Sequence, residues 1–185
     1  MSGRTAGGSW PETDVRVYLT GFMGSGKTAA GRKLAERLGV PFVDLDSEVE
    51  LRAGMTVLEI FERLGEPAFR GLEQEALRGT GELPDVVVAT GGGTVTFEAN
   101  ARWIRANGVS IWLNPPFATI VGRIGSLGKQ DRPLFRDEVQ ALALYRERLP
   151  AYRQADLTVD VGPAEQPEEI AARIDLMIGG GRCAT

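Results

Sequence analysis

Short apolar runs alternate along the chain with longer stretches in which apolar positions recur every three or four residues. The short runs are bounded by glycine, proline or aspartate and predict β-strands, whereas the longer spacing predicts helices. Strands are expected in residues 15–21, 42–46, 85–93, 109–114 and 156–162. The clearest helices are expected in residues 28–39, 72–79 and 168–178.

This alternation indicates the fold class. Strands separated by helices are typical of βαβ units, which build a parallel sheet covered by helices on both faces. The run VVVA at residues 86–89 is apolar at every position, as expected of a strand buried on both sides. In such sheets ligands bind beyond the carboxyl ends of the strands. The residues that follow each predicted strand are therefore the first candidates for a functional site.

Composition narrows the class of protein. The chain has 185 residues, is 43% hydrophobic and carries a formal net charge of −4, which suits one domain and argues against broad binding of nucleic acid. No segment has the length and apolar character of a membrane span or a signal-peptide core, so we expect a cytoplasmic protein. The chain has no histidine, which leaves proton transfer to carboxylate, lysine or tyrosine side chains.

The segment GFMGSGKT, residues 21–28, follows the first predicted strand and opens the first predicted helix. It fits the phosphate-binding pattern G-x-x-x-x-G-K-[ST], in which backbone N–H groups surround phosphate oxygens. Lys27 is expected on the β- and γ-phosphates, and Thr28 is expected to place its hydroxyl on Mg²⁺. The alternative is a glycine-rich turn with an accidental lysine, but the strand before it and the helix after it favour the phosphate loop.

Two aspartates follow the second predicted strand. If the strand continues through residue 46, Asp44 and Asp46 point to one side of it and Leu45 to the other. On its own this pair is equally well explained as a helix cap, with Asp46 or Ser47 in the capping position. Beside a phosphate loop, one carboxylate is better explained as a Mg²⁺ ligand acting through water and the other as a partner of an acceptor hydroxyl. Asp46 is the candidate base.

Three arginines, Arg70, Arg132 and Arg148, form the next candidate group. Any one of them is more typical of a protein surface than of a ligand site. Together with the glycine-rich segment at residues 91–93 they could bind a substrate carboxylate, because a guanidinium offers two parallel N–H donors.

The chain resembles the shikimate kinase family from about residue 15 to its last predicted helix. The segments that carry the resemblance occur in the family's order: GFMGSGKT, DLD, IFERLGEPAFRGLE, ATGGGTV, RPLF and ERLPAYRQAD. The resemblance implies a three-layer P-loop kinase fold with a five-stranded parallel sheet and a mobile lid. It also implies transfer of the ATP γ-phosphoryl group to the 3-hydroxyl of shikimate, with Mg²⁺ as cofactor.

Site residues follow from the resemblance by position. The implied catalytic residues are Lys27, Asp46 and Arg132. The implied ATP-binding residues are Gly24, Ser25, Gly26, Lys27, Thr28, Ala29, Arg123, Arg132 and Pro167. The implied shikimate-binding residues are Asp46, Phe61, Phe69, Arg70, Glu73, Gly91, Gly92, Gly93 and Arg148. Mg²⁺ is expected at Thr28 and Asp44.

The resemblance also implies how the chain is organised. We expect one kinase domain over residues 15–178 with its lid at about 124–137, a disordered segment at 1–14 and a flexible tail at 179–185. The protein is expected to act as a monomer, without nucleic acid or membrane partners. Three alternatives remain open: another small-molecule kinase such as one for gluconate, a P-loop ATPase or regulator, and a non-catalytic relative.

Overall fold

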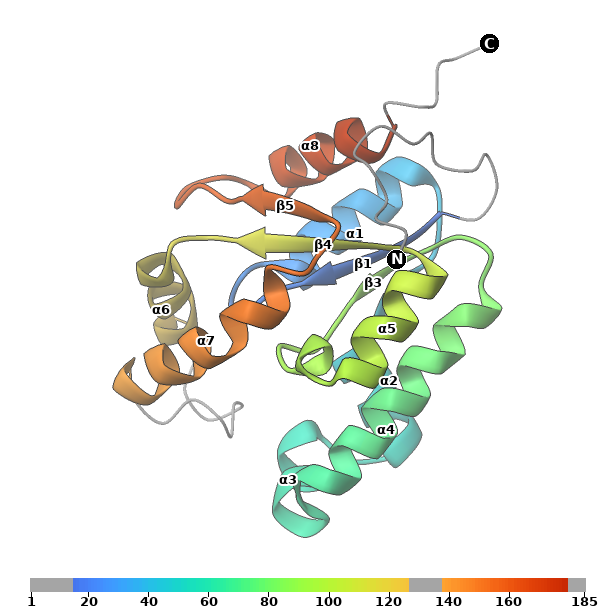
Figure 1. Cartoon of the computed structure of the whole chain (residues 1–185), viewed down its shortest axis with the longest axis vertical. Coiled ribbons are helices and arrows are strands. Elements are labelled where there is room, and N and C mark those ends of the chain that lie inside the picture. Colours follow the sequence, from blue (N-terminus) through green and yellow to red (C-terminus); the bar gives the residue numbers. More distant parts are fainter. Residues whose placement is uncertain (1–14, 127–137, 180–185) are drawn as a thin grey trace, which may run out of the picture.

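The computed structural model describes residues 15–126 and 138–179, and within them five parallel strands form one sheet (Figure 1). The strands are β1 (Arg16–Thr20), β2 (Phe42–Asp44), β3 (Val86–Ala89), β4 (Val109–Asn114) and β5 (Leu157–Asp160). Their order across the sheet is β2-β3-β1-β4-β5, so β1 lies at the centre. The predicted five-stranded parallel sheet is confirmed.

Helices connect the strands and lie on both sides of the sheet (Figure 1). They are α1 (Lys27–Leu38), α2 (Leu45–Ala53), α3 (Val57–Arg63), α4 (Gly65–Gly79), α5 (Glu98–Asn107), α6 (Phe117–Ser126), α7 (Glu138–Tyr152) and α8 (Pro167–Gly179). Two short 3₁₀ turns, η1 (Thr80–Glu82) and η2 (Thr94–Thr96), flank β3. No helix in the described ranges is long and apolar enough to cross a membrane.

Each face of the sheet has its own hydrophobic core. Alternate residues of the central strand point to opposite faces, so Val17 and Leu19 join one cluster and Tyr18 joins the other. The first cluster is closed by α1 and α8, which pack against each other through residues such as Leu34 and Ile174. The second cluster is closed by helices from α2 to α7. Burial on both faces explains why the central strands are apolar almost throughout.

The loops that follow β1, β2 and β3 meet at the carboxyl edge of the sheet, because parallel strands end on the same side. After β1 comes the phosphate-loop segment, residues 21–28; after β2 comes the N-terminus of α2; after β3 comes a glycine turn, residues 91–93. The expected rim of ligand-binding loops is thus formed.

Some predicted segments fall outside the described residues. These are the N-terminal segment 1–14, the tail beyond Gly179, and residues 127–137 of the predicted lid. Arg132, the predicted lid arginine, belongs to the last of these.

Candidate active site

One pocket of about 800 Å³ runs along the carboxyl edge of the sheet. It is lined by the phosphate loop, the start of α2, the glycine turn and parts of α3, α4, α6, α7 and α8. Most residues expected from the sequence to bind ligand contribute to its wall. They are Gly24, Gly26, Lys27, Thr28, Ala29, Asp44, Asp46, Phe61, Phe69, Arg70, Glu73, Gly91, Gly92, Gly93, Arg123, Arg148 and Pro167.

The phosphate loop connects β1 to α1 in a backbone conformation that glycine favours. Gly24 and Gly26 have φ angles of 76° and 97°, values that residues with a Cβ adopt only with strain. Gly26 is also the N-cap of α1, so the positive end of that helix points into the loop. Backbone donors and a helix N-terminus together make a site for anions, as expected of a phosphate loop.

Lys27 is the first residue of α1, and its side chain is almost fully buried, with 9% exposed. Its ammonium group donates hydrogen bonds to the carbonyls of Gly21 and Phe22, at 2.9 Å each. These bonds hold the ammonium group of Lys27, the only cationic side chain of the segment GFMGSGKT, against the backbone of the loop.

The two aspartates after β2 differ from the expected arrangement. The strand ends at Asp44 and helix α2 begins at Leu45, so strand alternation does not hold and Asp46 lies in the first turn of the helix. The cap is Asp44 rather than Asp46 or Ser47: its carboxylate accepts from the N–H groups of both, at 3.1 and 3.4 Å. The free N–H groups of a helix start favour a carboxylate in this position.

Asp44 also reaches the phosphate loop. The hydroxyl of Thr28 donates to its second carboxylate oxygen at 2.7 Å, so the two predicted Mg²⁺ ligands are direct neighbours. Asp46 also lines the pocket, and its Oδ1 lies 3.1 Å from where a Cβ would stand on Gly91. The two carboxylates therefore have different neighbours, Thr28 for Asp44 and the glycine turn for Asp46, and the division of their roles stays a prediction.

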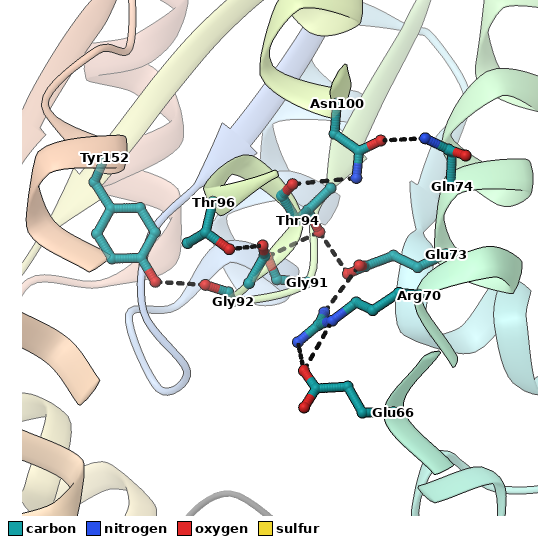
Figure 2. A network of polar contacts seen from close by, with 11 residues as sticks. Glu66, Arg70, Glu73, Gln74, Gly91, Gly92, Thr94, Thr96, Asn100 and Tyr152 are labelled. Carbon is teal, nitrogen blue, oxygen red and sulfur yellow. Dashed lines mark hydrogen bonds and ion pairs between the residues drawn. The ribbon is translucent and has the colours of Figure 1, made fainter. Parts of the chain in front are cut away.

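Arg70, on α4, is held between two glutamates (Figure 2). Its Nε and Nη2 donate to Glu66 at 3.1 and 2.9 Å, and its Nη1 donates to Glu73 at 2.9 Å. Glu73 is fully buried and also accepts the Thr94 hydroxyl at 2.6 Å. Burial of Arg70 acts to lower its pKa, but the charges and hydrogen bonds of Glu73 and Glu66 outweigh it and raise the pKa. A guanidinium thus stays charged in a mostly buried position beside the pocket.

The glycine turn owes its composition to crowding. None of its three residues has a positive φ. A Cβ on Gly91 would stand 2.4 Å from the Glu73 carboxylate, and one on Gly93 would stand 2.8 Å from Nη2 of Arg70. Both distances are shorter than real Cβ contacts, so a side chain at Gly91 or Gly93 would force Glu73 or Arg70 to shift.

Helix α7 supplies Arg148 to the opposite side of the glycine turn. Arg148 is 7% exposed, and its Nη1 lies 3.5 Å from where a Cβ would stand on Gly92. Arg70 and Arg148 therefore flank the turn from two different helices. The apolar wall comes from Phe61 and Phe69, whose ring centroids are 4.8 Å apart.

The other end of the pocket is lined by α6 and by the loop before α8. Arg123 donates to the carbonyls of Gly24 and Ser25 at 3.5 and 3.3 Å, which links α6 to the phosphate loop. Pro167 lines the pocket together with residues 163–166. Sequence reasoning missed those four residues, although they follow β5 and the rule that singled out the other strand ends applies to them equally.

A few further residues complete the comparison with the sequence. Ser25 is fully buried in the loop and is the one predicted ATP ligand among the described residues that does not line the pocket; its hydroxyl has no hydrogen-bond partner among them. Wall residues that no sequence pattern singled out are Met23, Glu50, Val57, Thr90 and Ile170. Val57 lies one helical turn before Phe61, so its helical spacing was the available signal.

A phosphate loop, an acidic pair and two buried arginines around one pocket define a P-loop enzyme that acts on a small anionic substrate. A family model described as shikimate kinase matches residues 23–178. The chain is 40% identical to a shikimate kinase of Ruegeria pomeroyi over 94% of this chain and 89% of that one, and 41% identical to one of Geobacter sulfurreducens over 90% and 94%. The chain belongs to the shikimate kinase family and is an ATP-dependent phosphotransferase.

Solved structures agree with this assignment. A shikimate kinase of Acinetobacter baumannii, solved in complex with shikimate, superimposes with a TM-score of 0.87 at 33% identity and covers 94% of this chain and 97% of its own. The high TM-score and coverage show that the similarity to this family holds for the fold as well as for the sequence.

Proposed function

We propose that the pocket transfers the γ-phosphoryl group of ATP to the 3-hydroxyl of shikimate, which gives shikimate 3-phosphate and ADP. The observation that carries this proposal is that Arg70, Arg148 and the glycine turn line the same pocket as the phosphate loop. ATP bound at the phosphate loop and an acceptor bound through its carboxylate at the arginines can therefore react while each stays bound to its own residues.

The phosphate half holds and neutralises the nucleotide. Backbone N–H groups of the loop and the N-terminus of α1 receive the phosphates, and Lys27 donates to the oxygens on which charge grows during transfer. Such preorganised donors stabilise the transition state more than the ground state.

The oxygens of Thr28 and Asp44 fit Mg²⁺. They are hard ligands, and they are 2.7 Å apart. A magnesium ion held by few protein oxygens and by the phosphates is the usual arrangement in kinases. When bound, the ion offsets negative charge on the β- and γ-phosphates.

The acceptor half binds and activates shikimate. Arg70 and Arg148 bind its carboxylate from two sides, and Phe61 and Phe69 cover its ring. Asp46 accepts the proton of the attacking hydroxyl, a role that falls to a carboxylate because the chain has no histidine. Arg132, from the predicted lid, is proposed to close over the phosphates and exclude water. A monomeric state and a cytoplasmic location remain predictions from the sequence.

A coupled assay of ADP release tests the proposal. ATP and Mg²⁺ are offered with shikimate, quinate, gluconate, a nucleoside monophosphate or no acceptor. We expect rapid ADP release with shikimate and a kcat/KM lower by about a hundredfold or more with the others, since a site built around specific polar groups strongly rejects analogues that leave them unpaired. Equal ADP release without an acceptor would identify an ATPase, and preference for gluconate would identify a different small-molecule kinase.

A further inference from the structure

The three carbonyls of the glycine turn, residues 91–93, all accept hydrogen bonds (Figure 2). Two of them accept from nearby residues in the chain and one from a distant residue. The outer two accept from residues three positions further on: Gly91 from the N–H and hydroxyl of Thr94 at 3.2 and 3.0 Å, and Gly93 from the N–H and hydroxyl of Thr96 at 3.1 and 2.7 Å. The middle carbonyl, on Gly92, accepts from the hydroxyl of Tyr152, sixty residues away on α7. The local bonds form with the turn itself, whereas the tyrosine connects the turn to another helix.

Tyr152 is well placed to hold that carbonyl rigidly. Its side chain is fully buried and stacks on Trp112 of β4, with ring centroids 6.1 Å apart and planes at 25°. Burial raises the pKa of its hydroxyl, against smaller opposing effects of Arg148, through its charge and a hydrogen bond, and of the Arg70 charge. The hydroxyl therefore keeps its proton at every pH at which the enzyme would work and remains a donor.

The bond to Gly92 determines the direction of the next amide. A trans peptide unit is planar, so its N–H points opposite to its carbonyl, and the described residues contain no cis peptide. Fixing the Gly92 carbonyl toward α7 therefore aims the Gly93 N–H away from α7. The amide N–H groups of the turn donate to no backbone carbonyl of the described residues, and all three residues line the pocket.

Gly93 is also the turn residue that lies against Arg70, since a Cβ on Gly93 would stand 2.8 Å from Nη2. We propose that Tyr152 is a positioning residue for the acceptor substrate: its hydroxyl holds the Gly92–Gly93 peptide so that the Gly93 N–H donates to the substrate's anionic group beside Arg70. The identity of the substrate in this proposal rests on the proposed function. The hydrogen bond from Tyr152 to Gly92 does not depend on it.

Two tyrosines make a matched test. In Tyr152→Phe the ring can still stack on Trp112, and the Gly92 carbonyl loses its donor. Tyr18→Phe is the control, because Tyr18 is equally buried, packs against Trp103, and shares a hydrogen bond of 3.1 Å with Thr80, sixty-two residues away, outside the pocket wall. Both variants lose one hydroxyl from a buried tyrosine, so both are expected to lower the melting temperature by similar amounts.

The two variants should differ in the turn and in the acceptor. Amide exchange of Thr94 and Thr96, followed by NMR in the full chain without ligands, should become about tenfold faster in Tyr152→Phe and stay unchanged in Tyr18→Phe. The KM for shikimate should rise about five- to tenfold in Tyr152→Phe, the fold-change expected when one hydrogen bond to an anion is misaligned, with the KM for ATP within about twofold of wild type.

Unchanged exchange in Tyr152→Phe, or a rise in both KM values alike, would overturn the inference. The exchange experiment needs no substrate, so it decides whether the hydroxyl holds the turn even if the wild type prefers an acceptor other than shikimate. Preference of the wild type for an acceptor other than shikimate would overturn the proposed function. Faster exchange in Tyr152→Phe would still support the role of Tyr152 toward the anion that the pocket binds.

Discussion

The phosphate loop and the glycine turn both line the pocket and both consist largely of glycine, but for different physical reasons. In the phosphate loop, Gly24 and Gly26 have positive φ angles that other residues adopt only with strain. In the glycine turn no φ angle is positive, and glycine is favoured because a Cβ on Gly91 or Gly93 would displace Glu73 or Arg70. One site depends on backbone conformation and the other on side-chain packing.

The two regions also handle charge differently. The phosphate loop relies on backbone N–H groups, a helix N-terminus and one lysine, so it can accept any chain of phosphates. The glycine turn is surrounded by side-chain charges that are already paired, as Arg70 is with Glu66 and Glu73 (Figure 2). Paired and buried charges have few alternative arrangements, so we expect this region to determine which acceptor is bound.

The largest effect is expected from Lys27→Met in the phosphate loop. Loss of a donor that acts mainly on the transition state should lower kcat/KM by about a hundredfold to a thousandfold, while the fold stays intact. Lys33→Met on the same helix is the control, because Lys33 is partly exposed and its ion pairs among the described residues are with the surface residues Glu36 and Glu168. Near-normal turnover of Lys27→Met would mean that the phosphate loop has been misinterpreted.

A comparable but more specific effect is expected at the two aspartates. Asp46→Asn cannot accept a proton, so kcat should fall roughly a hundredfold with the KM for ATP little changed. Asp44→Asn should instead raise the Mg²⁺ concentration needed for half-maximal rate, since Asp44 lies against Thr28. Steady-state rates over a Mg²⁺ titration separate the two. Identical responses of both variants would contradict the division of roles between them.

Replacing one glycine of each region with alanine tests whether the two regions bind different ligands. The expected changes in KM are smaller than the losses of rate predicted for Lys27 and Asp46. Gly26→Ala forces a residue with a Cβ to φ 97° and should weaken ATP binding, whereas Gly93→Ala displaces Arg70 and should weaken shikimate binding. Each KM should rise roughly tenfold for one ligand and stay within about twofold for the other. Calorimetric titration with each ligand gives the same contrast at equilibrium. If both variants lost both ligands equally, the two regions would not be separate sites.

The sequence predicted the sheet and most of the pocket wall because these depend on local patterns. Apolar runs identified all five strands, and the spacing of GFMGSGKT placed the phosphate loop between β1 and α1. The resemblance to a family then placed Arg70, Arg148 and the glycine turn, which lie far apart in the chain.

What the sequence could not supply were contacts that depend on where a strand ends or on how distant segments pack. The extended pattern of FVDLD hid the helix start at Leu45, and with it the capping role of Asp44. The bond from Tyr152 to Gly92 joins residues sixty positions apart, and nothing local distinguishes Tyr152 from any other apolar-facing tyrosine of a helix. The crowding that favours glycine at Gly91 and Gly93 likewise appears only once α4 and the turn are packed together.

The most direct test of the central claim, that the arginine side of the pocket binds a carboxylate, compares shikimate with its methyl ester. The ester keeps the ring and hydroxyls and loses the anion. Arg70 would keep its bonds to Glu66 and Glu73, but the N–H donors that it and Arg148 offer to the substrate would lose their charged acceptor. We predict that wild-type kcat/KM is higher for the acid by about a hundredfold or more, and that Arg70→Lys loses most of this preference because an ammonium cannot reproduce a two-pronged contact. Comparable kcat/KM for acid and ester in the wild type would contradict the claim.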